Sequence, residues 1–92
     1  MQEVWREFGE ARMCALINGE RGWLMHLRFE GDEGLHSVDL ECQDDGESDF
    51  LLNNGQLDRY PTAWALPVEI VDRALEHFER TGEAAPFVAW EV

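Results

Sequence analysis

Residues 67–90, PVEIVDRALEHFERTGEAAPFVAW, combine the signals of one helix and one strand. Pro67 suits the first turn of a helix, and Gly82 can adopt the left-handed conformation that ends one. Between them, apolar side chains recur at spacings of three and four and form one helical stripe: Val68, Val71, Ala74, Leu75 and Phe78. The segment therefore predicts an amphipathic helix over residues 67–81.

Charges on the other side of this helix support the same interpretation. Glu69 with Arg73, and Glu76 with Arg80, stand four residues apart, so we expect two favourable ion pairs on its exposed face. After Pro86 the chain reads FVAWEV, which is typical of a strand. We expect this last strand to join a sheet, with Trp90 in the core between sheet and helix.

The residues before the helix predict antiparallel strands. The run ARMCALIN (11–18) is apolar and ends at the Gly-rich turn NGERG. WLMHLRFE (23–30) and LHSVDLEC (35–42) alternate with a period of two, which predicts one buried face in each strand. In the second of these we expect Val38, Leu40 and Cys42 to point inward, and Ser37, Asp39 and Glu41 outward.

A further hairpin is centred on Asn54-Gly55, because both positions tolerate a positive φ and apolar runs flank them. Residues 1–10 are mixed and fit either a short helix or an irregular lead-in. Taken together, the pattern predicts a single α+β domain over residues 1–92. It has a meander sheet of about five to six strands, one helix packed on it and a C-terminal strand.

Composition limits the classes of function. The chain has twenty acidic residues, seven arginines and no lysine, for a net charge of −13. Such a protein repels nucleic acid and anionic membranes and associates quickly with a basic partner. Its apolar runs are too short for a membrane span and its N-terminus lacks the pattern of a signal peptide, so we expect a cytoplasmic protein. Cys14 and Cys42 do not form a CxxC pair, and we expect free thiols.

The sequence contains only weak signals for catalytic or cofactor-binding sites. His26 and His36 could be cross-strand neighbours, and either cysteine could join them, but the spacing is not that of a zinc site. The segment DDGESD (44–49) lacks the order of ligands that a calcium loop needs. We therefore predict no enzyme activity, no cofactor and no metal.

The acidic residues are unevenly distributed. From Glu30 to Asp49 the chain carries nine acids and no arginine, which is −9 of the total −13. We expect the loops and one strand face of this segment to merge into a single negative surface. One interpretation is a solvated edge that resists aggregation; the other, which the clustering favours, is a surface for a basic partner.

The second half of the chain resembles immunity protein family one of bacterial polymorphic-toxin systems. The features that carry the resemblance cover about residues 50–91 and come in the family's order: Asn54-Gly55, Tyr60-Pro61, Pro67, Phe78, Thr81-Gly82, Pro86 and Trp90. The chain departs from the family's pattern in two places. In GEAAP more residues separate the glycine from the proline than we expect for the family, and the N-terminus is short.

The resemblance implies a small protein that binds a cognate toxin and inactivates it in the producing cell. Such toxins are often nucleic-acid deaminases, whose active-site mouth must be basic. Acidic residues on the inhibitor would then compete for that mouth. The residues that we expect to contact the toxin are Asp32, Glu33, Asp44, Asp45, Glu47, Asp49, Tyr60 and Trp64.

Other interpretations remain open. Trp64 fits equally well as a core residue at the entry to the helix. The protein could be an acidic adaptor or nucleic-acid mimic that binds many basic proteins. It could also be a small enzyme or ligand-binding domain, which would require a concave pocket with convergent polar groups.

Overall fold

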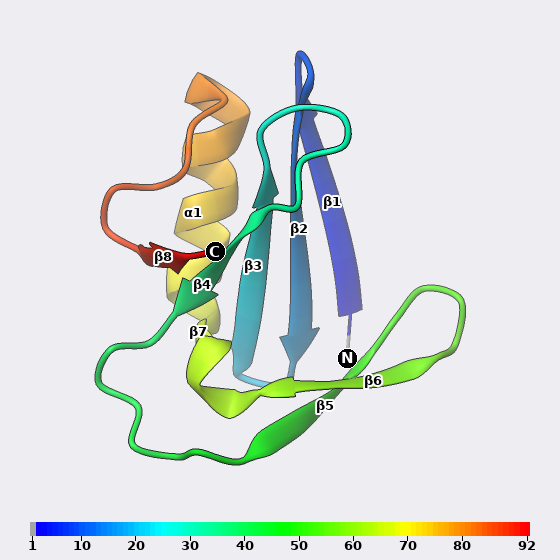
Figure 1. Cartoon of the computed structure of the whole chain (residues 1–92), viewed down its shortest axis with the longest axis vertical. Helices are drawn as coiled ribbons and strands as arrows, with labels where there is room; N and C mark the ends of the chain where they lie inside the picture. Colours follow the sequence, from blue (N-terminus) through cyan, green and yellow to red (C-terminus); the bar gives the residue numbers. More distant parts are fainter. Residues whose placement is uncertain (1) are drawn as a thin grey trace.

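A computed structural model describes residues 2–92 and has an α+β fold (Figure 1). The main sheet is antiparallel, in the order β1-β2-β3-β4-β8, with the short β7 paired to β3. β5 and β6 form a separate two-stranded sheet, and α1 covers one face of the main sheet. The predicted fold class is confirmed. The elements are β1 (Gln2–Phe8), β2 (Ala11–Asn18), β3 (Arg21–Leu27), β4 (Leu35–Val38), β5 (Glu47–Leu51), β6 (Leu57–Pro61), the 3₁₀ helix η1 (Thr62–Trp64), β7 (Leu66–Pro67), α1 (Val68–Thr81) and β8 (Ala89–Glu91).

Two tight turns set the register of the first three strands. Gly9-Glu10 joins β1 to β2, and Gly19-Glu20 joins β2 to β3. Both glycines have positive φ, 59° and 66°, while the glutamates do not, which is the geometry of a type II′ hairpin turn. Residues 2–8 are thus a strand, and the prediction of a helix or an irregular lead-in is wrong. The sequence of β1 does not alternate clearly because this edge strand is largely exposed.

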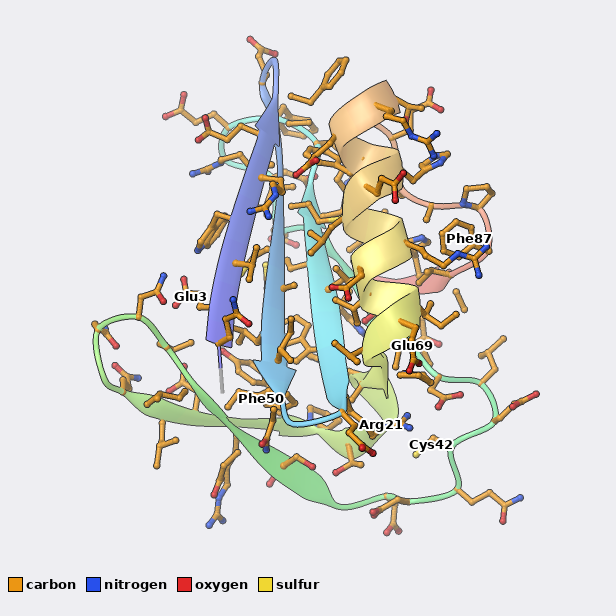
Figure 2. All side chains as sticks on the ribbon, turned by 180° about the vertical axis from the view of Figure 1, so that it is seen from behind. Glu3, Arg21, Cys42, Phe50, Glu69 and Phe87 are labelled. Carbon is orange, nitrogen blue, oxygen red and sulfur yellow. The ribbon has the colours of Figure 1, made fainter. Side chains whose placement is uncertain are left out.

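The helix forms where the sequence predicts it, one residue later than expected at its start. It buries Val71, Ala74, Leu75 and Phe78 against the sheet, and Figure 2 shows its axis running in nearly the same direction as the strands. Gly82 ends it with a φ of 74°, and its N–H donates to the carbonyl of Phe78 at 2.7 Å. No helix within residues 2–92 is long and apolar enough to cross a membrane.

The two ion pairs expected along the helix are not among those formed by residues 2–92. The guanidinium of Arg73 lies instead over the ring of Phe87, 5.2 Å from its centre. A different helix acid, Glu79, pairs with Arg6 of β1. Contacts to other elements have replaced contacts along the helix, since exposed pairs on one helix stabilise by only about 0.2–0.5 kcal/mol.

β3 differs from the expectation of one buried face. It lies in the middle of the sheet with α1 on one side and the β5–β6 hairpin on the other, so Trp23 and Leu24 are both buried. His26, on the face opposite Trp23, is buried as well, against the helix. The strand also ends at Leu27, which leaves Phe29 exposed in the following turn.

The inward and outward assignment of residues 37–42 is wrong. β4 ends at Val38, and Leu40 is 78% exposed, whereas Ser37 is fully buried. Ser37 tolerates burial because its Oγ accepts from the N–H of Leu24 at 2.9 Å and donates to the carbonyl of Trp64 at 2.8 Å. Asp39 also turns back, to pair with Arg21 at 2.7 Å.

The hairpin at Asn54-Gly55 is confirmed, with Gly55 at a φ of 88°. It does not continue the meander but crosses the ends of the central strands (Figure 1), and Phe50 is buried beneath it. The last strand is also confirmed, since β8 pairs with β4. Trp90 packs against the helix-side core, and its Nε1 donates to the carbonyl of Ala85 at 3.0 Å.

Candidate protein-binding surface

The sheet face opposite α1 carries a group of large apolar and aromatic side chains. Because side chains alternate along a strand, the register places Trp5, Cys14, Met25 and His36 in one cross-strand row of this face. The neighbouring row holds Glu3, Leu16 and Trp23. We call this sheet face, together with Tyr60 and Trp64 that pack on it, the aromatic face.

One end of the aromatic face is a cluster of rings around Trp23. Its ring centre lies 4.5 Å from that of Tyr60 and 5.1 Å from that of Trp64. Trp64 stacks on His36 with the centres 3.8 Å apart. Tyr60 and Trp64, both predicted as binding residues, therefore lie together. Each is half-buried, so each contributes to the core and to the surface.

A hollow of about 190 Å³ opens beside this cluster. Its walls are mostly apolar, and Trp5 stands at its rim with 41% of its surface exposed. The lining residues are Glu3, Trp5, Cys14, Leu16, Trp23, Met25, Leu52 and Tyr60. A hollow of this size fits one apolar side chain of a partner better than a drug-sized ligand, whose sites measure roughly 300–1,000 Å³.

Glu3 fixes the shape of this hollow. One carboxylate oxygen accepts from the indole N–H of Trp5, and the other accepts from the backbone N–H of Asn53 at 2.8 Å. Glu3 therefore ties β1 to the turn of the β5–β6 hairpin. The hydrogen bond from Asn53 and, to a smaller extent, that from Trp5 lower the pKa of the Glu3 carboxyl. The carboxylate is therefore charged at neutral pH.

Two polar groups of the hollow, Cys14 and Tyr60, are held in their protonated forms. Burial raises the pKa of the Cys14 thiol to about 12, with the negative charge of Glu3 adding to the effect, so the thiol is protonated and a poor nucleophile. Burial also raises the pKa of the Tyr60 hydroxyl, which donates to Asp58 at 3.2 Å. Cys14 and Cys42 are both free thiols.

The histidines do not converge. In the β3–β4 register His36 is opposite Met25 and Leu35 is opposite His26, so the two histidines point to opposite faces of the sheet. The expectation that they could be cross-strand partners is wrong by one residue. Within residues 2–92, no group of three histidine, cysteine or acidic side chains is placed to hold a metal ion.

The acidic residues of the segment 30–49 separate into two groups. Asp32 and Glu33 lie in the turn after β3, whereas Asp44, Asp45, Glu47 and Asp49 lie beyond β4, at the other end of the strands (Figure 1). The structure does not bring them into the single surface that we expected. The strand β4 runs between the two groups and separates them. Counting charges along the sequence does not reveal this separation.

Ion pairs and hydrogen bonds also occupy several of these acids. The side chain of Asp32 is 5% exposed, and its oxygens accept from Arg28 and from the backbone N–H of Gly34. Hydrogen bonds from Arg28 hold the pKa of the Asp32 carboxyl well below its usual range. Asp49 pairs with Arg59 at 3.0 Å. Asp32 therefore stabilises a turn and presents little surface to a partner.

The remaining predicted acids differ in position. Glu33 lines a hollow of about 140 Å³ together with Met25, His36 and Trp64, so it belongs to the rim of the aromatic face. Asp44, Asp45 and Glu47 are exposed. Their loop is tied to η1, because the N–H of Thr62 donates to the carbonyl of Gly46 at 3.0 Å. They thus lie beside the segment that carries Trp64.

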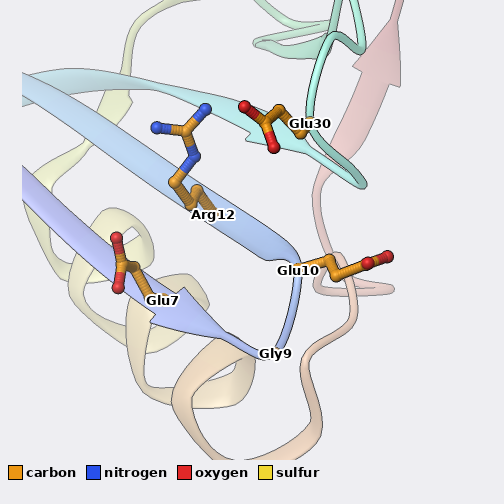
Figure 3. Close-up of a pocket in the computed structure, with 5 residues that line it drawn as sticks. All are labelled: Glu7, Gly9, Glu10, Arg12 and Glu30. Atoms are coloured by element: carbon orange, nitrogen blue, oxygen red, sulfur yellow. The ribbon is translucent and has the colours of Figure 1, made fainter.

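A third hollow continues the aromatic face toward the β1–β2 turn (Figure 3). The residues that line it are Glu7 of β1, Gly9 and Glu10 of the turn, Arg12 of β2, and Glu30. The guanidinium of Arg12 lies 5.8 Å from the ring centre of Trp5. Carboxylates therefore flank Trp5 along β1 on both sides, at Glu3 and Glu7.

Reasoning from the sequence missed Glu3, Trp5 and Glu7, because residues 1–10 were not expected to be a strand. A signal was present in the repeated Gly-Glu pair. Gly9-Glu10 and Gly19-Glu20 both stand between runs of strand-forming residues, and a type II′ turn takes glycine at its first central position.

Comparisons with known proteins give no relative: no family model, no curated protein and no solved structure matches this chain.

Proposed function

We propose that the protein is an immunity protein, which binds a cognate bacterial toxin of the nucleic-acid deaminase class and covers its basic active-site cleft. The chain itself performs no catalysis and needs no cofactor. It acts in the cytoplasm of the cell that makes the toxin. The resemblance of residues 50–91 to immunity protein family one suggests this function.

The observation that carries the proposal is the composition of the aromatic face. Exposed Trp5 stands beside an apolar hollow, and the carboxylates of Glu3, Glu7 and Glu33 border the same face. Aromatic anchors next to apolar pockets are typical hot spots of protein interfaces. A rim of negative charge on a chain of net charge −13 favours a basic partner and speeds the encounter with it.

The acids before and within β5 have a supporting part in this proposal. Asp44, Asp45 and Glu47 are exposed and lie next to η1, so they can extend the negative rim past Trp64. Asp49 and Asp32 are engaged with arginines, and their part is to hold the surface in shape. Exposed charges of this kind contribute mainly to the association rate.

The test is binding to a deaminase-like toxin domain encoded beside the gene. We expect one stable complex with a Kd of about 1 nM, corresponding to roughly −12 kcal/mol, and loss of deaminase activity on mixing. A variant with Asp44, Asp45 and Glu47 changed to arginine should associate at least about tenfold more slowly at low salt.

The matched control carries the same change of charge on the helix, with Glu69, Asp72 and Glu76 changed to arginine; all three side chains are exposed there. If both triple variants lose the same association rate, the loop is ordinary solvated surface and only net charge matters. If no toxin domain binds the unmodified protein, the immunity function itself is excluded.

A second candidate function is an acidic adaptor that binds many basic proteins, which the net charge alone would support. The two functions differ in selectivity. An adaptor would bind a panel of unrelated basic proteins with similar, strongly salt-dependent affinities. An immunity protein would retain nanomolar affinity for one partner at physiological salt, because apolar contacts at the aromatic face are not screened.

A further inference from the structure

β1 is the long free edge of the main sheet. It pairs with β2 on one side, and within residues 2–92 no strand pairs with its other side. Figure 1 shows it as the outermost strand. The opposite edge is β8, which has three residues against seven in β1. An unpaired edge of this length presents a row of backbone donors and acceptors on which another strand can add.

The turn at Gly9-Glu10 determines which residues present those groups. In a two-residue hairpin the pair next to the turn, here Phe8 and Ala11, is hydrogen-bonded, and bonding then alternates along the strand. Gln2, Val4, Arg6 and Phe8 therefore direct their backbone groups to β2. Glu3, Trp5 and Glu7 direct theirs outward, to the free edge.

The same three residues direct their side chains to the aromatic face. A strand that pairs with the free edge therefore also contacts a fixed pattern of side chains, Glu-x-Trp-x-Glu, with the apolar hollow behind Trp5. A strand added here would place every second side chain directly opposite these three, at a Cβ separation of about 4.5–5.5 Å. Edge geometry supplies affinity and the side-chain pattern supplies selectivity.

Charge decides between a second copy of the chain and a different partner. Two copies paired antiparallel through Trp5 would place Glu3 of each opposite Glu7 of the other, and like charges directly opposite are destabilising. Each copy also carries −13. An added strand with an apolar residue in the middle and a basic residue two positions away on each side removes both conflicts.

We infer that β1 binds an extended, basic segment of the partner by strand addition. An apolar side chain of that segment packs on Trp5 at the hollow, and arginine or lysine side chains lie opposite Glu3 and Glu7. Because Glu-x-Trp-x-Glu reads the same in both directions, the pattern accepts a parallel or an antiparallel strand. The identification of the partner as a toxin rests on the proposed function, whereas the edge and its pattern rest on geometry alone.

The experiment uses a capped synthetic peptide, Thr-Arg-Thr-Leu-Thr-Arg-Thr, titrated into the isotope-labelled full chain. We expect amide chemical-shift changes centred on Glu3, Trp5 and Glu7, slower solvent exchange of their amides, and a shift of the Trp5 indole. Two control peptides test the mode of binding. One carries N-methyl groups on the pairing side of the backbone, and the other replaces arginine by glutamate; each should bind at least about tenfold more weakly.

A charge-swap variant tests the register. Glu7→Arg should weaken the arginine peptide and improve binding of a peptide in which one arginine is replaced by glutamate. Glu10→Arg is the matched control, since it makes the same change of charge in the turn of the same hairpin, outside the pairing residues of β1, and it should change neither affinity. Shift changes away from β1, or equal binding of the N-methylated peptide, would overturn the inference.

The toxin domain separates this inference from the proposed function. If the toxin binds tightly and Glu7→Arg and Trp5→Ala leave its affinity unchanged, strand addition at β1 is wrong while the immunity function stands. If the peptide binds at β1 and no toxin domain binds the protein, the edge site stands and the immunity function is wrong.

Discussion

The ring of Phe8, at the end of β1, lies against the backbone of Gly82, the residue that ends α1. A Cβ built on Gly82 would stand 2.4 Å from Cδ1 of Phe8, closer than two carbon atoms can approach. The backbone of Gly82 has a φ of 74°, which side chains other than glycine's rarely accept. This contact joins the candidate binding strand to the helix on the other side of the sheet.

Gly82→Ala should therefore lower the free energy of unfolding by about 2–3 kcal/mol, through backbone strain of roughly 1 kcal/mol and displacement of the Phe8 ring. Urea unfolding of the two proteins measures the difference. In a Phe8→Ala background the same glycine substitution should cost only the strain. A coupling below about 0.5 kcal/mol between the two positions would contradict the contact.

Ser37→Ala should cost about 2 kcal/mol of stability, because it leaves the N–H of Leu24 and the carbonyl of Trp64 without their shared partner in a buried site. The position of Trp64 on the aromatic face should change as well, which the chemical shift of its indole would report. Ser48→Ala is the control, since that hydroxyl bonds to Thr62 at a half-buried site and should cost less than about 1 kcal/mol. Equal losses in the two variants would argue against this assignment.

His26 should make stability depend on pH in the neutral range. Burial, with the nearby charge of Arg28, lowers the pKa of His26, and the side chain is enclosed by Phe78 and Trp90. Below the unfolded pKa of about 6.5, the unfolded chain therefore takes up a proton that the folded chain does not. Stability falls as the pH drops from about 7 toward the folded pKa.

His26→Leu should remove this dependence and stabilise the protein by about 1 kcal/mol at pH 8, because within residues 2–92 neither ring nitrogen has a hydrogen-bond partner. Denaturant unfolding at pH 8 and pH 5.5 measures both effects. The gain should be larger at pH 5.5. A gain that is equal at the two pH values would show that His26 is not the titrating group.

Asp32 should affect stability at lower pH than His26 does. Hydrogen bonds from Arg28 depress the pKa of its carboxyl, so its contribution is fully present above the unfolded pKa of about 3.9. That contribution is lost as the pH falls below about 4 toward the folded pKa. Asp32→Asn should therefore lower the melting temperature at pH 7 and have a progressively smaller effect as the pH is lowered from 4 to 2.

The control for this prediction is Glu33→Gln, which removes the neighbouring charge from an exposed side chain. It should leave the melting temperature nearly unchanged at both pH values. If Asp32→Asn and Glu33→Gln behave alike, the network around Asp32 does not stabilise the turn.

Much of the local structure could be predicted from the sequence. The helix follows from apolar spacing and from the glycine at its end, and the β5–β6 hairpin follows from Asn54-Gly55. These signals are local: a few neighbouring residues determine the backbone conformation by their own sterics. The same reasoning failed for Leu40 and Ser37, because the length of β4 depends on where its partner strands end.

The candidate site was predictable only in part. Tyr60, Trp64 and Glu33 do lie on the aromatic face or its rim, whereas Asp44, Asp45 and Glu47 lie beside it, in the loop tied to η1. Trp5 was missed because an exposed edge strand has little alternation of polarity, and its pairing with Cys14 becomes evident only in the assembled sheet. Nothing in the sequence distinguishes Asp32 from the other acids, but in the structure its carboxylate is paired with Arg28.

The sequence by itself therefore determined the helix and its end, the strands from residue 11 onward in outline, and the excess negative charge, since each depends on residue chemistry and short-range backbone preference. Tertiary structure alone decided which face of the sheet α1 covers, which strand remains at the free edge and which acids stay unpaired. Those outcomes depend on contacts between residues far apart in the chain. Two examples of such contacts are the register of β1 on β2 and the pairing of β4 with β3 and β8.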